Sequence, residues 1–258
     1  MQTYLAVTPD NLDAALRCTS RIAHVAYRID EEGVLSSSEF LQQIRGGLMV
    51  LSDGDGCEIR DPSELCRAVW NECEGRGFAG VVADFEQPFS EQYCAFLNQL
   101  CSILRRNGRQ LFVPEVYGCE VRGAMVLICT AVSGGTLRHR LEEARKQFGD
   151  RVALDLQRVR MEFPLPCPGG EGNALSPETL CKLLDEKPAV FFSEDLCAKY
   201  FVRVCGCEPR FVLFDDAQTL RRKLRMAQGM GITPAFVMYP EVHDILEELW
   251  GQKNIQNK

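Results

Sequence analysis

The chain has 258 residues, of which 46% are hydrophobic, and its formal net charge is −7. A chain of this length can bury one large core, and about 250 residues is the usual size of a (β/α)8 barrel. A net acidic surface gains nothing by approaching another polyanion, so the charge disfavours nucleic acid and anionic membranes as partners. We therefore expect one domain over residues 1–258 that binds neither.

The N-terminal sequence, MQTYLAV, has neither the basic start nor the long apolar stretch of an export signal, and no apolar run is long enough to span a membrane. The 13 cysteines lie within apolar stretches, which is typical of reduced thiols in a large chain. We expect a cytoplasmic protein. Cys205 and Cys207 form the closest pair, but without a second pair or a nearby histidine they predict no metal site, and the sequence indicates no cofactor.

Short apolar, β-branched runs alternate with stretches of helical spacing, the βαβα pattern of a parallel sheet. Eight strands are predicted, at 3–8, 21–28, 47–52, 78–84, 110–115, 125–130, 151–163 and 231–238. Helices are predicted at about 10–18, 36–45, 62–76, 90–106, 136–148, 215–229 and 241–250. This order of elements predicts an α/β fold of the (β/α)8 TIM-barrel type.

The segment from about 165 to 214 breaks this alternation. It contains a loop rich in proline and glycine, a short helix beginning near Ser176-Pro177, and two strand-like runs, KYFVRV and RFVLFD. We interpret it as a small α+β insertion after the seventh strand, within the same barrel domain.

The active site of a TIM barrel lies at the carboxyl ends of its strands. The residues predicted there are mostly acids and tyrosines, which suits a neutral, hydroxyl-rich ligand better than a phosphate. The candidates for substrate binding are Tyr27, Asp53, Glu115, Tyr117, Glu162 and Tyr239.

Two carboxylates stand out in the sequence GVVADFE, which ends at Glu86. Residues two apart in a strand project to the same side, so Asp84 and Glu86 would both face the barrel mouth. Neighbouring carboxylates raise each other's pKa, so one can act as a general acid near neutral pH. A strand end followed by a helix-capping acid would give the same spacing without catalysis.

The segment containing these acids resembles the D-G-x-D-x-D-x-E strand of family 18 glycoside hydrolases, the chitinase and spore-cortex-lytic group, with Gly80, Asp84 and Glu86 in matching positions. The sequence FDDA at 214–217, followed by Lys223, is similar to a helix start of that family, and the resemblance spans roughly residues 70–250. It implies substrate-assisted retaining hydrolysis of N-acetylglucosamine-containing glycans such as chitooligosaccharides or peptidoglycan fragments. In that mechanism Glu86 would be the acid and base, and Asp84 would orient the sugar's acetamido group.

The sequence also departs from the family pattern. Ala79 and Val82 occupy the positions of the first two aspartates of the motif, Ala131 and its neighbours replace a tyrosine-bearing segment, and Met238 lies near the position of a tryptophan. Each lost positioning group can cost on the order of 10²–10³ in rate. Two hypotheses stay open: a glycosidase, or a carbohydrate-binding or interaction protein that has lost catalysis.

A third hypothesis concerns the sequence SGGT at 133–136, which precedes a predicted helix. Free backbone N–H groups at a helix N-terminus can hold an anion, so a phosphosugar or carboxylate ligand would fit there. A simple turn with a helix cap explains the same residues.

Overall fold

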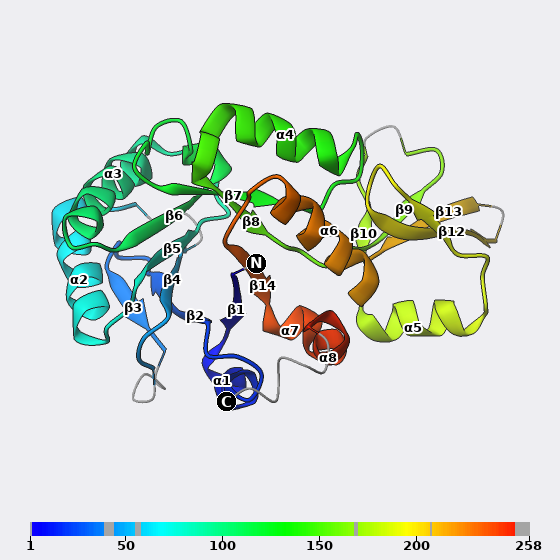
Figure 1. The fold of residues 1–258 in the computed structure, drawn as a ribbon, viewed down its shortest axis with the longest axis horizontal. Coiled ribbons are helices and arrows are strands. Elements are labelled where there is room, and N and C mark those ends of the chain that lie inside the picture. The colour runs from blue at the N-terminus through cyan, green and yellow to red at the C-terminus, as the bar shows by residue number, and fades with distance from the viewer. Residues whose placement is uncertain (1, 39–43, 55–57, 168–169, 207, 251–258) are drawn as a thin grey trace.

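The computed structural model describes residues 2–38, 44–54, 58–167, 170–206 and 208–250 (Figure 1). Within these residues, eight parallel strands close into a barrel, which confirms the predicted (β/α)8 fold. In barrel order they are β1 (Thr3–Val7), β2 (Ile22–Ile29), β4 (Leu48–Ser52), β5 (Gly80–Asp84), β6 (Gln110–Pro114), β7 (Met125–Cys129), β8 (Val152–Asp155) and β14 (Ala235–Met238). The barrel is closed because β1 pairs with both β2 and β14.

Helices cover the outside of the barrel (Figure 1). They are α1 (Leu12–Leu16), α2 (Pro62–Gly75), α3 (Glu91–Arg106), α4 (Leu137–Phe148), α6 (Ala217–Gly229), α7 (Tyr239–Val242) and α8 (Leu246–Trp250). The cap predicted for α2 is present, since the Asp61 carboxylate accepts the backbone N–H groups of Ser63 and Glu64. None of the helices in the described part of the chain is long and apolar enough to cross a membrane.

Two of the predicted helices differ from the structure. The helix expected at 36–45 begins instead as β3 (Leu35–Ser37), which pairs antiparallel with β2, and residues 39–43 of that prediction lie outside the described residues. The helix expected at 241–250 is divided into α7, a 3₁₀ turn (His243–Ile245) and α8.

The strand expected at 151–163 is two strands in different sheets, β8 and β9 (Arg160–Pro164). Between them, side chains accept the backbone N–H groups that a longer strand would give to the sheet. The Gln157 N–H donates to the Thr130 hydroxyl at 3.2 Å, and the Val159 N–H donates to the Asp215 carboxylate at 2.9 Å. The inserted sheet therefore starts before residue 165. The assignment of the whole chain to a single domain stays a prediction.

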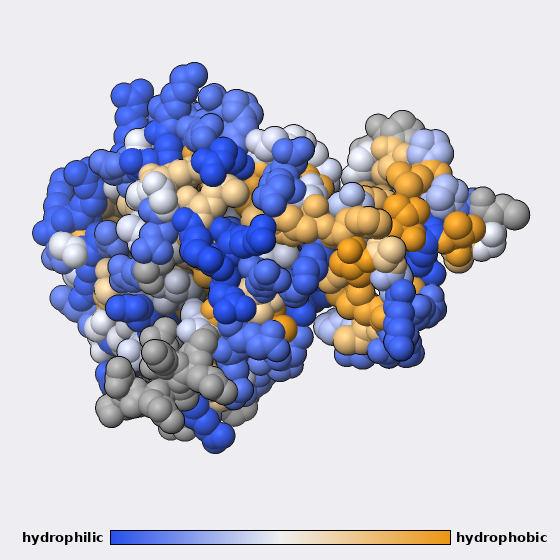
Figure 2. Space-filling model, turned by 45° about the vertical axis from the view of Figure 1, so that its right-hand side comes forward, coloured by the Kyte–Doolittle hydropathy of each residue, from blue (hydrophilic) through white to orange (hydrophobic). Residues whose placement is uncertain are grey.

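The insertion is an antiparallel sheet in the order β10 (Asn173–Ala174), β9, β13 (Glu208–Phe214), β12 (Ala198–Cys205) and β11 (Phe191–Ser193). Helix α5 (Pro177–Asp185) covers one face, where Leu180 and Leu183 pack against Phe201. On the insertion, Phe191, Val202 and Val204 are exposed. Figure 2 shows hydrophobic residues gathered over this lobe, on the right of the view.

The barrel interior is filled by alternate residues of the strands, because successive side chains of a strand point to opposite faces. The interior cluster consists of Ala6, Ala23, Leu48, Val50, Val82, Phe112, Ala153 and Phe236. Two residues beyond Val82 and Ala153, in the direction of the mouth, lie Asp84 and Asp155. Because inward and outward side chains alternate along each strand, these two carboxylates also point inwards. They do so at the carboxyl ends of the strands, the end of the barrel that we call the mouth.

A buried ion pair joins the insertion to the barrel. The Lys223 ammonium on α6 donates to the Asp215 carboxylate at 2.7 Å, and the exposed fractions of the two side chains are 1% and 0%. The hydroxyl of Thr219 and the backbone N–H of Val159 also donate to this carboxylate, at 2.7 and 2.9 Å. The pair thus connects the end of β13, the start of α6 and the turn that follows β8.

We predict that Lys223→Met lowers the free energy of unfolding by about 3–5 kcal/mol, because it leaves the Asp215 charge buried without its cation. The double variant Asp215→Asn/Lys223→Met should recover part of this loss, since no buried charge remains. Chemical denaturation followed by circular dichroism measures both. A single variant as stable as the wild type would contradict the structural role given to the pair.

Candidate functional site

Asp84 is the last residue of β5 and lies at the mouth of the barrel. Its side chain reaches solvent through the mouth, but the surrounding barrel wall limits its hydration, which raises the pKa of its carboxyl. The negative charges of Glu86 and Asp53 raise this pKa further. These charges act on Asp84, so the structure brings three of the predicted acids together.

Glu86 lies in the loop that follows β5, and its side chain is exposed. The intervening Phe85 is buried and packs edge-on against Tyr93, with 4.9 Å between the ring centroids. The Asp53 carboxylate accepts the backbone N–H groups of Glu86 and Gln87, each at 3.0 Å. Asp53 therefore fixes the backbone that carries Glu86, a different role from the substrate contact expected from the sequence.

Asp155 ends β8 and was not among the predicted site residues. Burial raises the pKa of its carboxyl to about 6, and the charges of Asp84 and Glu241 act in the same direction against the opposing hydrogen bond from Gln157. The sequence signal was a lone acid in the apolar run VALDL. A single strand to residue 163, as the sequence predicts, places the mouth at Glu162 instead of Asp155.

The neighbours of these acids in the sheet are uncharged. Cys129 pairs with Asp155 in the β7–β8 register, and burial raises the pKa of its thiol, which favours the neutral form. Ser52 pairs with Asp84 in the β4–β5 register and borders a hollow of about 320 Å³ between β2, β3 and β4. This hollow therefore lies on the strand next to that of Asp84, and Asp84 itself does not line it.

Two of the three predicted tyrosines, Tyr27 and Tyr117, are buried. The Tyr27 hydroxyl donates to Glu72 on α2 at 3.2 Å, and burial, with the nearby Glu72 charge, raises the pKa of Tyr27. The register of β2 shifts between Val25 and Tyr27, so that Tyr27 joins the outer core instead of the interior. The Tyr117 hydroxyl accepts the Ser90 N–H at 3.3 Å, which places this ring under the loop after β5.

The remaining predicted binding residues have protein partners. Glu115 forms an ion pair with Arg140 through both carboxylate oxygens, one of them at 2.7 Å. Glu162 lies in β9 and accepts from Arg203 at 2.8 and 2.9 Å, within the inserted sheet. Tyr239 begins α7 and is partly buried against the outer core. In the described part of the structure, these three side chains thus bond to or pack against other protein groups.

The helix that follows 133–136 is capped by its own chain. The Thr136 hydroxyl accepts the N–H of His139 at 3.1 Å, and the N–H of Leu137 donates to the carbonyl of Asp195 at 2.8 Å. Two N–H groups that an anion would need are therefore already bonded. Among the residues described, no group of three or more His, Cys, Asp or Glu is arranged to hold a metal ion, and Cys207 lies outside that set.

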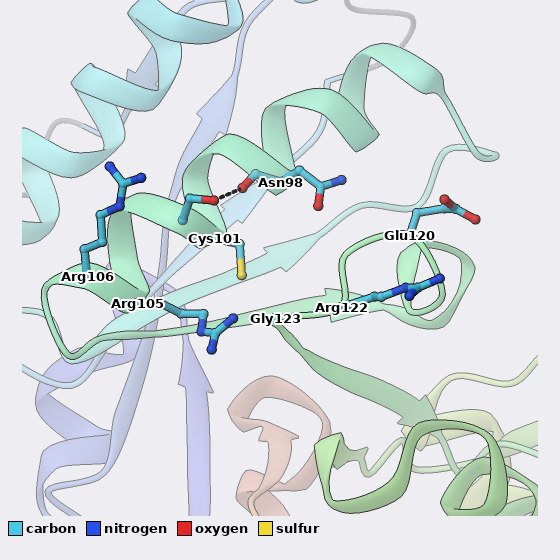
Figure 3. A pocket seen from close by; sticks show the side chains of 8 residues that line it. Asn98, Cys101, Arg105, Arg106, Glu120, Arg122 and Gly123 are labelled. Atoms are coloured by element: carbon cyan, nitrogen blue, oxygen red, sulfur yellow. Dashed lines mark hydrogen bonds between the residues drawn. The ribbon is translucent and has the colours of Figure 1, made fainter.

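A separate pocket of about 560 Å³ lies at the opposite end of the barrel. Figure 3 shows Arg105 and Arg106 projecting from the end of α3, with Glu120 and Arg122 on the loop that leads to β7. Helix α3 runs antiparallel to the strands, so its C-terminal end lies far from the mouth. This pocket is lined by none of the mouth acids.

The sequence matches no protein-family model and no curated protein. Solved structures of chitinases and spore cortex-lytic enzymes share the fold. The chitinase of Chromobacterium violaceum has a TM-score of 0.72 at 12% identity, covering 100% of this chain and 99% of its own. The Bacillus cereus spore cortex-lytic enzyme SleL has a TM-score of 0.68 at 16% identity, covering 96% of this chain and 74% of its own.

A family 18 N-acetylglucosaminidase from Paenibacillus barengoltzii is similar in the same way, with a TM-score of 0.69, 14% identity and coverage of 96% of this chain and 98% of its own. At these identities the likeness concerns the fold. It confirms, at that level, the resemblance to family 18 glycoside hydrolases predicted from the sequence.

We predict that the stability contributed by Asp155 depends on pH. The pKa of its carboxyl rises from the ordinary aspartate value of 3.8 to about 6 in the folded chain, so ionisation costs folding free energy as pH rises between these values. The free energy of unfolding of Asp155→Asn, taken relative to that of the wild type, should therefore be about 2 kcal/mol higher at about pH 7 than at about pH 4. Denaturation at both pH values measures this difference, and a constant difference would contradict the raised pKa.

Proposed function

We propose that the chain is a glycoside hydrolase that acts on N-acetylglucosamine-containing glycans through Glu86 and Asp84. The observation that carries the proposal is the acid cluster at the mouth, in which Asp53 holds the Glu86 backbone beside Asp84. The acids lie at the mouth of a barrel whose fold is similar to those of chitinases and a cortex-lytic enzyme, and this supports a glycan as substrate. The two candidate substrates are chitooligosaccharides and peptidoglycan fragments.

In the proposed reaction, Glu86 gives its proton to the glycosidic oxygen as the bond from that oxygen to the anomeric carbon breaks. The acetamido oxygen of the same sugar forms a bond to the anomeric carbon, and Asp84 accepts the acetamido N–H and stabilises the positive charge that develops. Water then attacks the anomeric carbon while Glu86 takes its proton. The two displacements retain the anomeric configuration.

Asp84 is suited to its part because its pKa is raised and its hydration restricted. A carboxylate with few water partners interacts more strongly with a nearby substrate charge than one in bulk water.

A second candidate is a glycan-binding protein without hydrolysis. Val82, in the barrel interior directly behind Asp84, is apolar where the resembling family has an aspartate. Met238, partly buried against the same interior cluster, takes the place of a tryptophan. Both substitutions remove groups that would support the reaction and leave the mouth open to a ligand.

We predict that Glu86→Gln lowers the hydrolysis rate by at least about 100-fold, because the amide cannot give a proton to the leaving oxygen. Mass spectrometry of N-acetylglucosamine oligomers and peptidoglycan fragments measures the products. Glu120→Gln is the matched control, since this exposed carboxylate lines the pocket at the opposite end. Binding without cleavage by the wild type would favour the second candidate, and equal rates for wild type and Glu86→Gln would exclude Glu86 as the acid.

We predict that Asp53→Ala lowers kcat by about 10- to 100-fold with a smaller change in KM. The variant removes both hydrogen bonds to the loop, so Glu86 loses its fixed position relative to the leaving oxygen. Steady-state kinetics on the substrate identified above measures the changes in kcat and KM separately, and the melting temperature is the control for folding. An unchanged kcat in a folded variant would show that Asp53 does not position Glu86.

A further inference from the structure

A glycan in the mouth needs hydrogen-bond donors besides Glu86, whose proton the proposed reaction directs to the glycosidic oxygen. Asp84 acts there as an acceptor, and the neighbouring inward side chain on β7 is Cys129, whose thiol is a weak donor. An N-acetylated sugar also presents a carbonyl oxygen and several hydroxyl oxygens. Without a further donor, these oxygens would stay unpaired.

Asp155 has the position for this role. It lies two residues beyond Ala153, whose side chain is in the interior cluster, so its carboxyl points into the mouth from β8. Its Oδ2 accepts the side-chain amide of Gln157 at 2.9 Å. Its Oδ1 has no hydrogen-bond partner within the residues described, and it is therefore the oxygen available to carry a proton towards a ligand.

The charged groups around Asp155 favour the protonated form. Asp84 on β5 and Glu241 on α7 both act on it with negative charge. Its partner in the β7 register, Cys129, is neutral, and its partner in the β14 register is the apolar Phe236. A negative charge on Asp155 is therefore disfavoured, because acids lie nearby and the paired strands offer it no cation.

Two cations of the adjoining segments, Arg158 and Lys223, are bonded to groups other than Asp155. Arg158, three residues further along the chain, donates to Asp244 at 2.6 Å and to the carbonyl of Glu241 at 2.8 Å. Lys223 donates to the buried Asp215. Neither forms an ion pair with Asp155 in the described part of the structure.

We infer that Asp155 is a ligand-binding residue whose protonated carboxyl donates a hydrogen bond to a carbonyl or hydroxyl oxygen of a glycan held in the mouth. This inference rests on the proposed function and adds the residue that supplies the donor. A carboxyl that titrates at about 6 loses its donor above that pH and then repels the same oxygen. Glycan affinity should therefore fall as pH rises through about 6.

The test uses N-acetylglucosamine trisaccharide as the probe and Glu86→Gln as the background, so that the probe is not consumed. Calorimetry should give a Kd roughly fivefold higher at about pH 7.5 than at about pH 5. Adding Asp155→Asn, whose amide is a donor at every pH, should remove this difference and keep the tight binding. Adding Asp155→Ala should give the weak affinity at both pH values, and adding Glu120→Gln should leave the pH dependence in place.

Asp84 also has a raised pKa, so the loss of pH dependence in Asp155→Asn is the decisive comparison. If that variant keeps the full dependence, the donor is not Asp155, although the glycan site stands. If no variant binds the trisaccharide at either pH, the inference and the proposed function both fail.

A second readout needs no ligand. The chemical shift of the ¹³C-labelled Asp155 carboxyl, assigned by its loss in Asp155→Asn, should titrate near 6 in the free protein. Titration near the ordinary aspartate value of about 4 overturns the inference even if the glycan binds.

Discussion

The hydrogen bonds that β1 forms with both β2 and β14 close the barrel, and the rest of the architecture depends on this closure. A closed parallel sheet has no free edge, so every interior side chain is surrounded by others. It also brings the carboxyl ends of all strands to one rim. Asp84 and Asp155 are separated by about seventy residues of sequence, and closure is what allows their charges to interact.

Asp84 and Asp155 at the mouth lower the stability of the fold, and the proposed function gives them a role in binding a ligand. Each lies at the first inward position beyond the apolar layers represented by Val82 and Ala153, where a hydrophobic side chain would stabilise the barrel more. The cost appears as the raised pKa values of Asp84 and Asp155. Glu115 and Asp215 differ from these acids, because each forms an ion pair, with Arg140 and Lys223 respectively. Asp84 and Asp155 carry no such ion pair in the described part of the structure, and both lie where a ligand would enter.

The alternation of apolar runs and helical stretches was enough to predict the barrel, because each strand is buried on both faces. It failed at 151–163, where two strands of different sheets follow each other and the separating hydrogen bonds come from Thr130 and Asp215, which are distant in sequence. The site shows the same limit. Asp84 could be predicted from local spacing, whereas the outward turn of Tyr27 depends on a register shift in β2.

The most direct test of the central claim, a glycan site centred on Asp84 and Glu86, is a crystal structure of Glu86→Gln with N-acetylglucosamine trisaccharide. The account predicts that the sugar lies in the mouth, with an acetamido group within hydrogen-bond distance of Asp84 and the scissile oxygen beside residue 86. A trisaccharide bound instead on the exposed apolar face of the insertion, with the mouth filled only by water, would contradict it.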